Sequence, residues 1–295
     1  MGARKEQTLG AAAAFATVLI WSAVYGGKEL LLAHMSPAEL VAYQYVLAVP
    51  AIALLALLRK ERLWLPLRDM AAVWGSGLLG IALFQLAVNE GIQLVGSVPA
   101  AIFSGLLPTC ALLAAVVLER RRPNGWQLLS VLASTAGILL VTGAAGDGQG
   151  SLPGYLILLA SNFLWVAFCH LNKRLQETRH ISGLTLVFHQ SLVTALVLFP
   201  ASLAGGSDGA AALTQPDVLA LLLFLALGNA VLAYLLLNFA LQRLDVVLCN
   251  IIFNFVPVVT IVLNALLFGQ GIALGQLLGA GLIVSSVLIP AKRSG

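Results

Sequence analysis

Long apolar runs alternate with short polar joints along the whole chain. The runs are about 20 residues long, the length that an α-helix needs to cross a ~30 Å hydrocarbon core. Strands of a membrane barrel would instead alternate apolar and polar residues over about ten positions. We therefore expect an all-α, polytopic membrane protein with ten transmembrane helices, at 9–32, 38–58, 70–95, 97–118, 125–143, 153–173, 182–204, 216–241, 245–268 and 271–290.

The composition supports lipid as the solvent. Hydrophobic residues make up 60% of the 295 residues and charged residues 9%, whereas a soluble domain has about 25% charged residues. The mean hydropathy is +0.98. The polar joints are too short for a soluble domain, and the first run is too long for the apolar core of a signal peptide. We expect that run to be the first helix.

The basic residues fall almost entirely on one side of the ten expected helices. Of the 16 Lys and Arg residues, Lys28 alone lies on the side opposite the N-terminus. By the positive-inside rule, both termini are expected in the cytoplasm, in a multi-pass protein of the cytoplasmic (inner) membrane. This topology explains the net charge of +4 without a nucleic-acid partner. The residues on the N-terminal side are Arg4, Lys5, Arg59, Lys60, Arg62, Arg68, Arg120, Arg121, Arg122, Lys173, Arg174, Arg179, Arg243, Lys292 and Arg293.

The second half of the chain repeats landmarks of the first half. Each half contains five expected helices, an odd number, so the two repeats (1–146 and 147–295) enter the membrane in opposite orientations. Inverted repeats are typical of secondary transporters, with the substrate site at the repeat interface near the midplane. The matches at a shift of 149 are Asn89 with Asn238, Gln93 with Gln242, Pro108 with Pro257 and Gln127 with Gln276; those at 144 are Gly10 with Gly154 and Trp21 with Trp165.

Several of these segments resemble a known transporter family. The resemblance covers nearly the whole chain and is to the EamA-type, ten-helix members of the drug/metabolite transporter superfamily, with the YddG-like exporters of aromatic amino acids similar in size and aromatic content. It implies ten helices, two inverted repeats and export of small metabolites. The segments that carry it are Leu19-Ile20-Trp21-Ser22, Leu164-Trp165, the helices of Pro108 and Pro257, Leu118-Glu119-Arg120 and Gly275-Gln276-Leu277-Leu278-Gly279.

Polar residues recur every four positions on two of the expected helices. Such residues share one helix face, and polar groups at membrane depth prefer a bundle interior or a wet cavity. The stripes predict either a lining of the substrate pathway or hydrogen bonds between helices. They are Gln85, Asn89 and Gln93 on the third helix, and Tyr234, Asn238 and Gln242 on the eighth.

Aromatic residues form a second candidate group. Trp21 and Tyr25 share a face of the first helix, and Trp165 lies at matching depth in the sixth. Interfacial belts hold most membrane Trp and Tyr residues, but Trp21 and Trp165 lie near mid-span. They predict a pocket for a flat or apolar substrate, with core packing as the alternative.

Two further candidates are His189 and Asn254. His189 could titrate near neutral pH or be a buried, neutral, hydrogen-bonded histidine. Asn254 precedes Pro257 by three residues, so it could bond a carbonyl that the proline leaves free. We include both with Trp21, Tyr25, Gln85, Asn89, Trp165, Tyr234 and Asn238 as candidate substrate-binding residues.

Charged residues within the expected spans are few. Lys28 and Glu29 adjoin near the outer end of the first helix, and Glu90 is a candidate partner for Lys28. No Asp or Glu falls at mid-span, where a proton-coupled antiporter carries a carboxylate. Transport is therefore expected to be uncoupled or to use a group near the outer rim, such as Glu90.

The sequence thus predicts a secondary transporter that moves small organic metabolites, (aromatic) amino acids first among them, out of the cytoplasm by alternating access. Export of other metabolites or drugs, a channel and a membrane scaffold are the alternatives. No motif of an enzyme, metal site or cofactor site is found. The segment 75–80 matches G-x-G-x-x-G, but a nucleotide-binding motif of this kind follows a strand and precedes a helix, whereas this segment lies inside an apolar run. Small residues at Gly271, Gly275 and Gly279 predict either packing within the monomer or a homodimer contact.

Overall fold

The computed structural model describes residues 2–118, 120, 124–144, 151–204, 209–268 and 274–291, and every regular element in these ranges is helical. The apolar runs fold as helices because a chain in lipid must satisfy its backbone hydrogen bonds within each segment. The first half contains α1 (Gly2–Leu32), α2 (Pro37–Leu58), α3 (Leu67–Gly77), the π-helical segment η1 (Leu78–Leu83), α4 (Phe84–Val95), α5 (Ser97–Ser104), α6 (Leu107–Leu118) and α7 (Gly125–Ala144). The second contains α8 (Leu152–Arg179), α9 (Gly183–Ala204), α10 (Gly209–Ala212), α11 (Pro216–Phe224), the π-helical segment η2 (Leu225–Ala233), α12 (Tyr234–Leu241), α13 (Val246–Phe253), α14 (Phe255–Phe268) and α15 (Leu274–Ala291).

Seven helical segments in the described ranges are long and apolar enough to cross a membrane. This confirms an all-helical chain with the helices of a multi-pass membrane protein. The other three expected spans coincide with α5–α6, α7 and α15, which are not among the seven. The seven are 4–32, 37–58, 67–95, 152–179, 183–203, 216–241 and 246–263.

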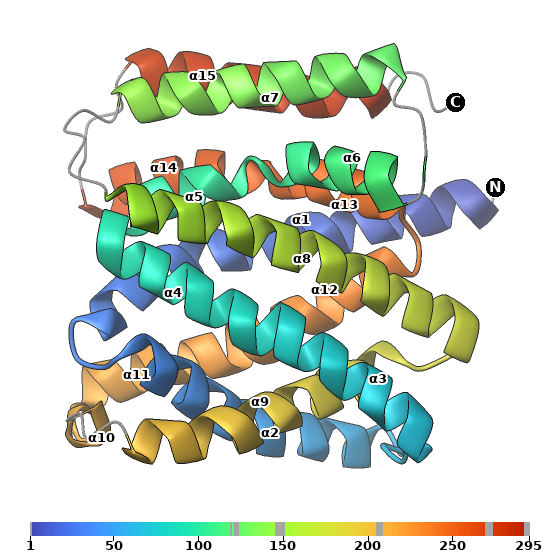
Figure 1. Cartoon of the computed structure of the whole chain (residues 1–295), viewed down its shortest axis with the longest axis vertical. Coiled ribbons are helices and arrows are strands. Elements are labelled where there is room, and N and C mark those ends of the chain that lie inside the picture. Colours follow the sequence, from blue (N-terminus) through green and yellow to red (C-terminus); the bar gives the residue numbers. More distant parts are fainter. Residues whose placement is uncertain are drawn as a thin grey trace.

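The helices pack in pairs that correspond under the duplication. α2 lies along α9, and α7 lies along α15 as a layer of its own at the top of Figure 1. The contact of α1 with α12 matches that of α8 with α4, and the contact of α5 with α14 matches that of α13 with α6. In Figure 1, α1 runs from the end marked N toward the opposite side, whereas α8 runs the other way.

Glycines allow α7 and α15 to approach closely. A Cβ on Gly137 of α7 would lie 2.7 Å from the carbonyl oxygen of Gly279 and 2.9 Å from Ile283. Gly279, one of the three small residues considered for a dimer contact, therefore packs against α7 of the same chain. Gly271 lies outside the described residues, and a homodimer contact stays a prediction.

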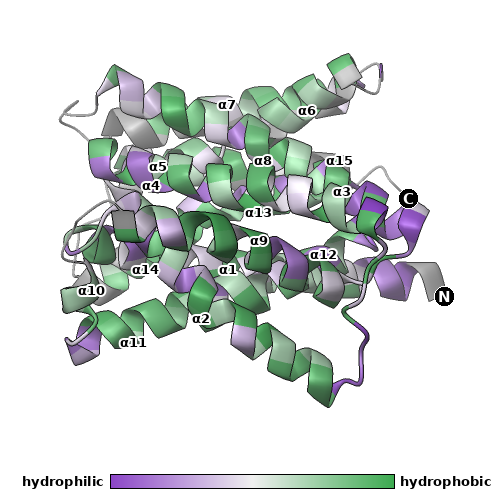
Figure 2. Cartoon of the chain, turned by 60° about the horizontal axis from the view of Figure 1, so that its bottom comes forward, coloured by the Kyte–Doolittle hydropathy of each residue, from purple (hydrophilic) through white to green (hydrophobic). Residues whose placement is uncertain are grey.

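The two ends of the bundle differ in polarity. We call the end that holds the start of α1 and the end of α15 the terminal end, and the opposite one the far end (Figure 1). Figure 2 shows hydrophilic residues gathered near the N-terminus and in the connection between α2 and α3, with apolar residues along the helices between the ends. Of the expected basic residues, Arg121, Arg122, Lys292 and Arg293 lie outside the described ranges, as does Glu119.

Polar contacts tie the helices together at the terminal end. Arg243 Nε donates to Glu6 Oε2 at 2.8 Å, and Arg179 forms an ion pair with Asp69. Lys173 Nζ donates to the carbonyl oxygens of Leu241 at 2.9 Å and Leu244 at 2.8 Å. These bonds connect α8 to α3 and to the end of α12, and the segment after α12 to α1.

Candidate functional site

A cavity lies between helices of both halves, from the middle of the bundle toward the far end. The space between the lining side chains that holds no protein atoms amounts to about 660 Å³, open solvent included. Its wall comes from α1, α4 and α5–α6 in the first half, and from α8, η2, α12 and α13–α14 in the second. The aromatic residues of this wall are Trp21, Tyr25, Phe84, Phe103, Trp165, Tyr234 and Phe253.

Two tryptophans that correspond under the 144-residue shift meet in this wall. The rings of Trp21 and Trp165 pack edge to face, with centroids 5.1 Å apart. Phe84 packs on Trp165 at 4.9 Å, and Phe253 packs on Trp21 at 5.1 Å. Such offset and edge-to-face pairs are favourable beyond their buried area. They form a rigid aromatic surface at mid-depth, which suits a flat or apolar ligand.

A line of polar contacts joins the two halves at the same depth. Lys28 Nζ donates to Gln85 Oε1, and Gln85 Nε2 donates to the Tyr234 hydroxyl at 3.3 Å. Gln85 and Tyr234 correspond under the 149-residue shift, so a second pair of equivalent positions is in contact. Lys28 is only 3% exposed and is the one charged side chain among the described residues of the wall.

A second hollow lies nearer the far end, next to the cavity. Leu32, Ala33, Ile92 and Gly96 line it together with Glu29 and Gln93. The expected pairing of Lys28 with Glu90 is wrong, because Lys28 bonds to Gln85 and Glu90 is exposed. Glu29 instead accepts a hydrogen bond from the Ser97 hydroxyl.

Both halves interrupt the same helix with a π-helical segment. Shifted by 149, η1 falls within η2. Insertions of this kind are frequent at functional sites. In η2 the segment brings Asn229 to the cavity wall, whereas the equivalent residue of η1 is Gly80. A Cβ on Gly80 would lie 2.1–2.2 Å from the Phe168 side chain, so only glycine fits there.

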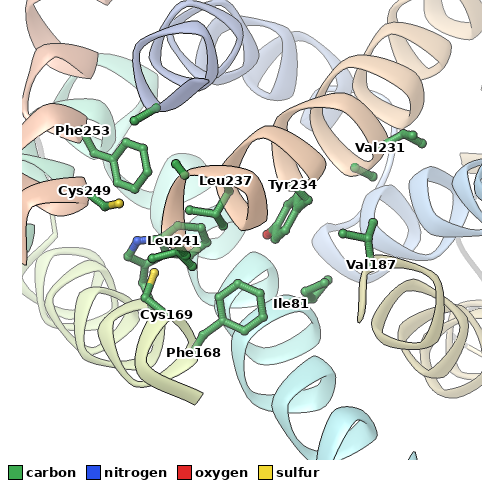
Figure 3. Close-up of a cluster of buried hydrophobic side chains, with 14 of the residues drawn as sticks. Ile81, Phe168, Cys169, Val187, Val231, Tyr234, Leu237, Leu241, Cys249 and Phe253 are labelled. Carbon is green, nitrogen blue, oxygen red and sulfur yellow. The ribbon is translucent and has the colours of Figure 1, made fainter. Parts of the chain in front are cut away.

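An apolar plug closes the cavity toward the terminal end. Figure 3 shows Ile81 of η1, Phe168 of α8 and Tyr234 of α12 gathered between their helices. The rings of Phe168 and Tyr234 lie 6.0 Å apart, and Leu237 is fully buried beside them. Close packing of this kind leaves no path for a polar solute.

Beyond the plug lies a layer of hydrogen-bonded amides. Asn238 Oδ1 accepts from Asn172 Nδ2 at 3.3 Å and from Gln176 Nε2 at 3.1 Å. Gln190 Nε2 donates to Asn172 Oδ1 at 2.8 Å and to the Ser76 hydroxyl at 2.7 Å. The layer joins α3, α8, α9 and α12, and these five side chains are buried.

The cavity gathers five of the nine predicted site residues, namely Trp21, Tyr25, Gln85, Trp165 and Tyr234. The other four lie outside its wall. Asn89 is buried beyond Gln85 and has no hydrogen-bond partner among the described residues, and Asn238 belongs to the amide layer. His189 accepts from Trp74 Nε1 at 3.3 Å and contacts the Leu63 carbonyl oxygen at 2.7 Å, which matches a buried, hydrogen-bonded histidine.

Asn254 differs from expectation. Its side-chain nitrogen and oxygen are buried and have no partner within the described ranges, so it bonds no carbonyl there that Pro257 leaves free. Wall residues that sequence reasoning did not select are Lys28, Phe84, Phe103, Asn162, Asn229 and Phe253. Lys28 carried a usable signal, since a lone charge within an apolar span is a functional candidate by default.

These features define a polytopic membrane protein with an aromatic and polar cavity between two similar halves. The chain belongs to the EamA-like transporter family, whose family model matches it twice, at residues 8–143 and 152–290. The two matches confirm the internal repeat. Members of this family are transporters, which confirms that the chain is not an enzyme.

Several relatives match over nearly their whole length. The chain is 17% identical to an uncharacterized transporter of Archaeoglobus fulgidus, over 94% of this chain and 96% of the relative. It is 23% identical to the uncharacterized transporter YyaM of Bacillus subtilis, over 90% and 88%. It is 27% identical to a protein of Salmonella typhimurium named probable amino-acid metabolite efflux pump, over 94% and 92%. A crystal structure with 18% identity shares the fold, with a TM-score of 0.75 and 96% of each chain covered.

Proposed function

We propose that this chain is a secondary transporter that exports small organic metabolites, aromatic amino acids or related compounds, across the cytoplasmic membrane. In this proposal ten helices form two inverted five-helix repeats, 1–146 and 147–295, which rock against each other. The central cavity holds the substrate and opens to each side in turn.

The observation that carries the proposal is the meeting of equivalent residues at the cavity. Trp21 touches Trp165, and Gln85 touches Tyr234. Contacts between equivalent positions are expected where a pseudo-twofold axis passes between repeats, and transporters of this type bind substrate at that place. The name of the Salmonella typhimurium relative supports amino acids or their derivatives as the substrate class.

The direct test is flux in proteoliposomes. We expect counterflow of at least one aromatic amino acid or derivative in a panel that also covers aliphatic amino acids. Uptake would be measured with and without a pH gradient, which distinguishes uncoupled from proton-coupled transport. Permeation of the whole panel without saturation or counterflow would instead favour a channel, and no flux of any solute would favour a scaffold.

The orientation has a separate test. Fifteen of the 16 basic residues are assigned to one side, and the described ones among them support a cytoplasmic terminal end. The three native cysteines are buried, so single exposed cysteines can report the sides. In intact cells, a membrane-impermeant maleimide should label Thr214→Cys at the far end and spare Trp64→Cys at the terminal end. The reverse pattern would contradict cytoplasmic termini.

A further inference from the structure

The substrate class can be narrowed by the charge in the cavity wall. Lys28 is buried there and, among the described residues, no carboxylate lies within ion-pair distance of it. An ammonium carries three N–H donors, and the one partner of Lys28 in this part of the chain is Gln85 Oε1. Two donors of a buried cation are therefore left for a ligand.

Two further buried N–H groups belong to side chains of the wall. They are Trp165 Nε1 and Asn229 Nδ2, and neither has a hydrogen-bond partner among the described residues. A buried charge is stable when an opposite charge and hydrogen bonds compensate it. The described part of the wall supplies no negative charge to compensate Lys28. A bound anion would supply it.

The described residues of the wall provide no carboxylate to pair with a ligand ammonium, since they include no Asp or Glu. The nearest acid along α1, Glu29, lines the separate hollow and accepts from Ser97. The aromatic surface around Trp21 and Trp165 fits a flat or apolar body.

We infer that the cavity binds small monocarboxylates with an aromatic or apolar body, that Lys28 binds the carboxylate, and that an α-ammonium group is not required. This inference rests on the proposed function for its place in transport, but it concerns ligand binding and is tested by binding. Gln85 is a positioning residue, since it holds the Lys28 ammonium and is itself held by Tyr234.

The test compares three matched probes on the purified full chain, by quenching of intrinsic tryptophan fluorescence. The probes are 3-phenylpropanoate, its neutral amide 3-phenylpropanamide, and L-phenylalanine. We expect the acid to bind at least about tenfold more tightly than the amide, as a charge-assisted hydrogen bond provides. L-Phenylalanine should bind no more tightly than the acid.

Two variants assign the effect to Lys28. Lys28→Met should lower affinity for the acid at least about tenfold and leave the amide unchanged, and Lys28→Arg should restore part of the loss. Gln85→Glu gives Lys28 a carboxylate partner within the protein, so it should lower the affinity for the acid. The substitution hardly changes the size of the side chain. Gln93→Glu makes the same change outside the wall, where Gln93 is exposed, and should have no effect.

The outcomes separate this inference from the proposed function. Equal binding of acid and amide, no binding of the acid, or unchanged binding in both Lys28→Met and Gln85→Glu would overturn the Lys28 assignment. L-Phenylalanine binding tenfold more tightly than the acid would overturn the monocarboxylate class. Counterflow of amino acids that is indifferent to Lys28→Met would leave the transporter standing without the inference. Binding of the acid without flux of any solute would support the Lys28 inference and contradict the proposed transport.

Discussion

Polar residues that correspond under the duplication lie at the far end and at the terminal end of the bundle. They differ in their hydrogen bonds. Lys28 corresponds to Asn172 under the shift of 144, and Asn89 corresponds to Asn238 under the shift of 149. Gln44 corresponds to Gln190 because α2 and α9 begin 146 residues apart. At the terminal end, Asn238 and Gln190 both bond to Asn172, and Gln190 Oε1 is the one amide atom of these three side chains that is buried without a partner among the described residues. At the far end, Gln44 Nε2 and both amide atoms of Asn89 are buried and find no partner in the part of the chain that the structure describes.

This difference indicates which side is closed. The bonded amides, together with the plug of Phe168 and Tyr234, seal the terminal end, and the cavity occupies the corresponding space toward the far end. Buried polar groups without partners cost free energy, which other states of the protein can recover. The alternating access that we propose therefore predicts that the far-end amides bond to each other when the terminal end opens.

The largest effect is expected from the two central tryptophans. Trp165 is 1% exposed and packs against Trp21, Phe84 and Phe168, whereas its equivalent Trp21 is only partly buried. Trp165→Ala should impair flux and cost about 3–5 kcal/mol of stability, as removal of a buried aromatic ring does. Trp21→Ala should impair flux at a smaller cost in stability. Melting temperatures in detergent, followed by counterflow on the folded fraction, would measure both; full activity in both would remove them from the pocket.

Overpacking at Gly80 should have the next largest effect. A methyl group there meets the root of the Phe168 side chain, which cannot move without disturbing the plug. Gly80→Ala should destabilise by about 1–3 kcal/mol, typical of an overpacked core. Gly75→Ala on the preceding turn is the control, because a Cβ at Gly75 meets nothing within 4 Å. Equal melting temperatures for the two variants would show that the plug is looser than described.

The amide positions give a smaller but sharper contrast. Asn238→Leu leaves Asn172 and Gln176 without a shared acceptor, whereas Asn89→Leu removes an amide that bonds to none of the described residues. Interhelical hydrogen bonds contribute about 0.6 kcal/mol each in membranes, so Asn238→Leu should lower stability modestly and impair flux. Asn89→Leu should leave stability unchanged or raise it. If Asn89→Leu proved the more destabilising of the two, the bonding described at the two ends would be reversed.

Hydrophobic run length predicted the positions of the long helices, although the expected spans 97–118 and 245–268 are each divided into two helices. The expected 216–241 coincides with α11, η2 and α12, and 38–58 differs from α2 by one residue. Lipid imposes helical hydrogen bonding on any long apolar segment, so the prediction needs no tertiary information. The π-helical segments were not predicted, because the apolar residues of η1 and η2 differ little from their neighbours.

Only part of the site was predicted, because the sequence shows which positions are equivalent but not how the helices are rotated. The 149-residue shift marked Gln85 and Tyr234 as equivalents, yet their contact depends on how two distant helices rotate about their axes. That rotation also decides why Gln85 lines the cavity while Asn89, one turn further, is buried outside the wall. Lys28 was assigned to the outer end of its helix, and its burial follows from the helices that cover it.

The smallest effect is expected at the ion pair of Glu6 and Arg243. Glu6 is 55% exposed, and exposed ion pairs contribute about 0–1 kcal/mol. Arg243 keeps its contacts with the Phe239 ring and carbonyl oxygen when Glu6 is changed, so Glu6→Gln removes the pair alone. Its melting temperature should match that of the unaltered chain at high salt, where screening weakens the pair in both. A loss of stability as large as that of Asn238→Leu would mean that the surface contacts, and not the buried amides and the plug, hold the terminal end closed.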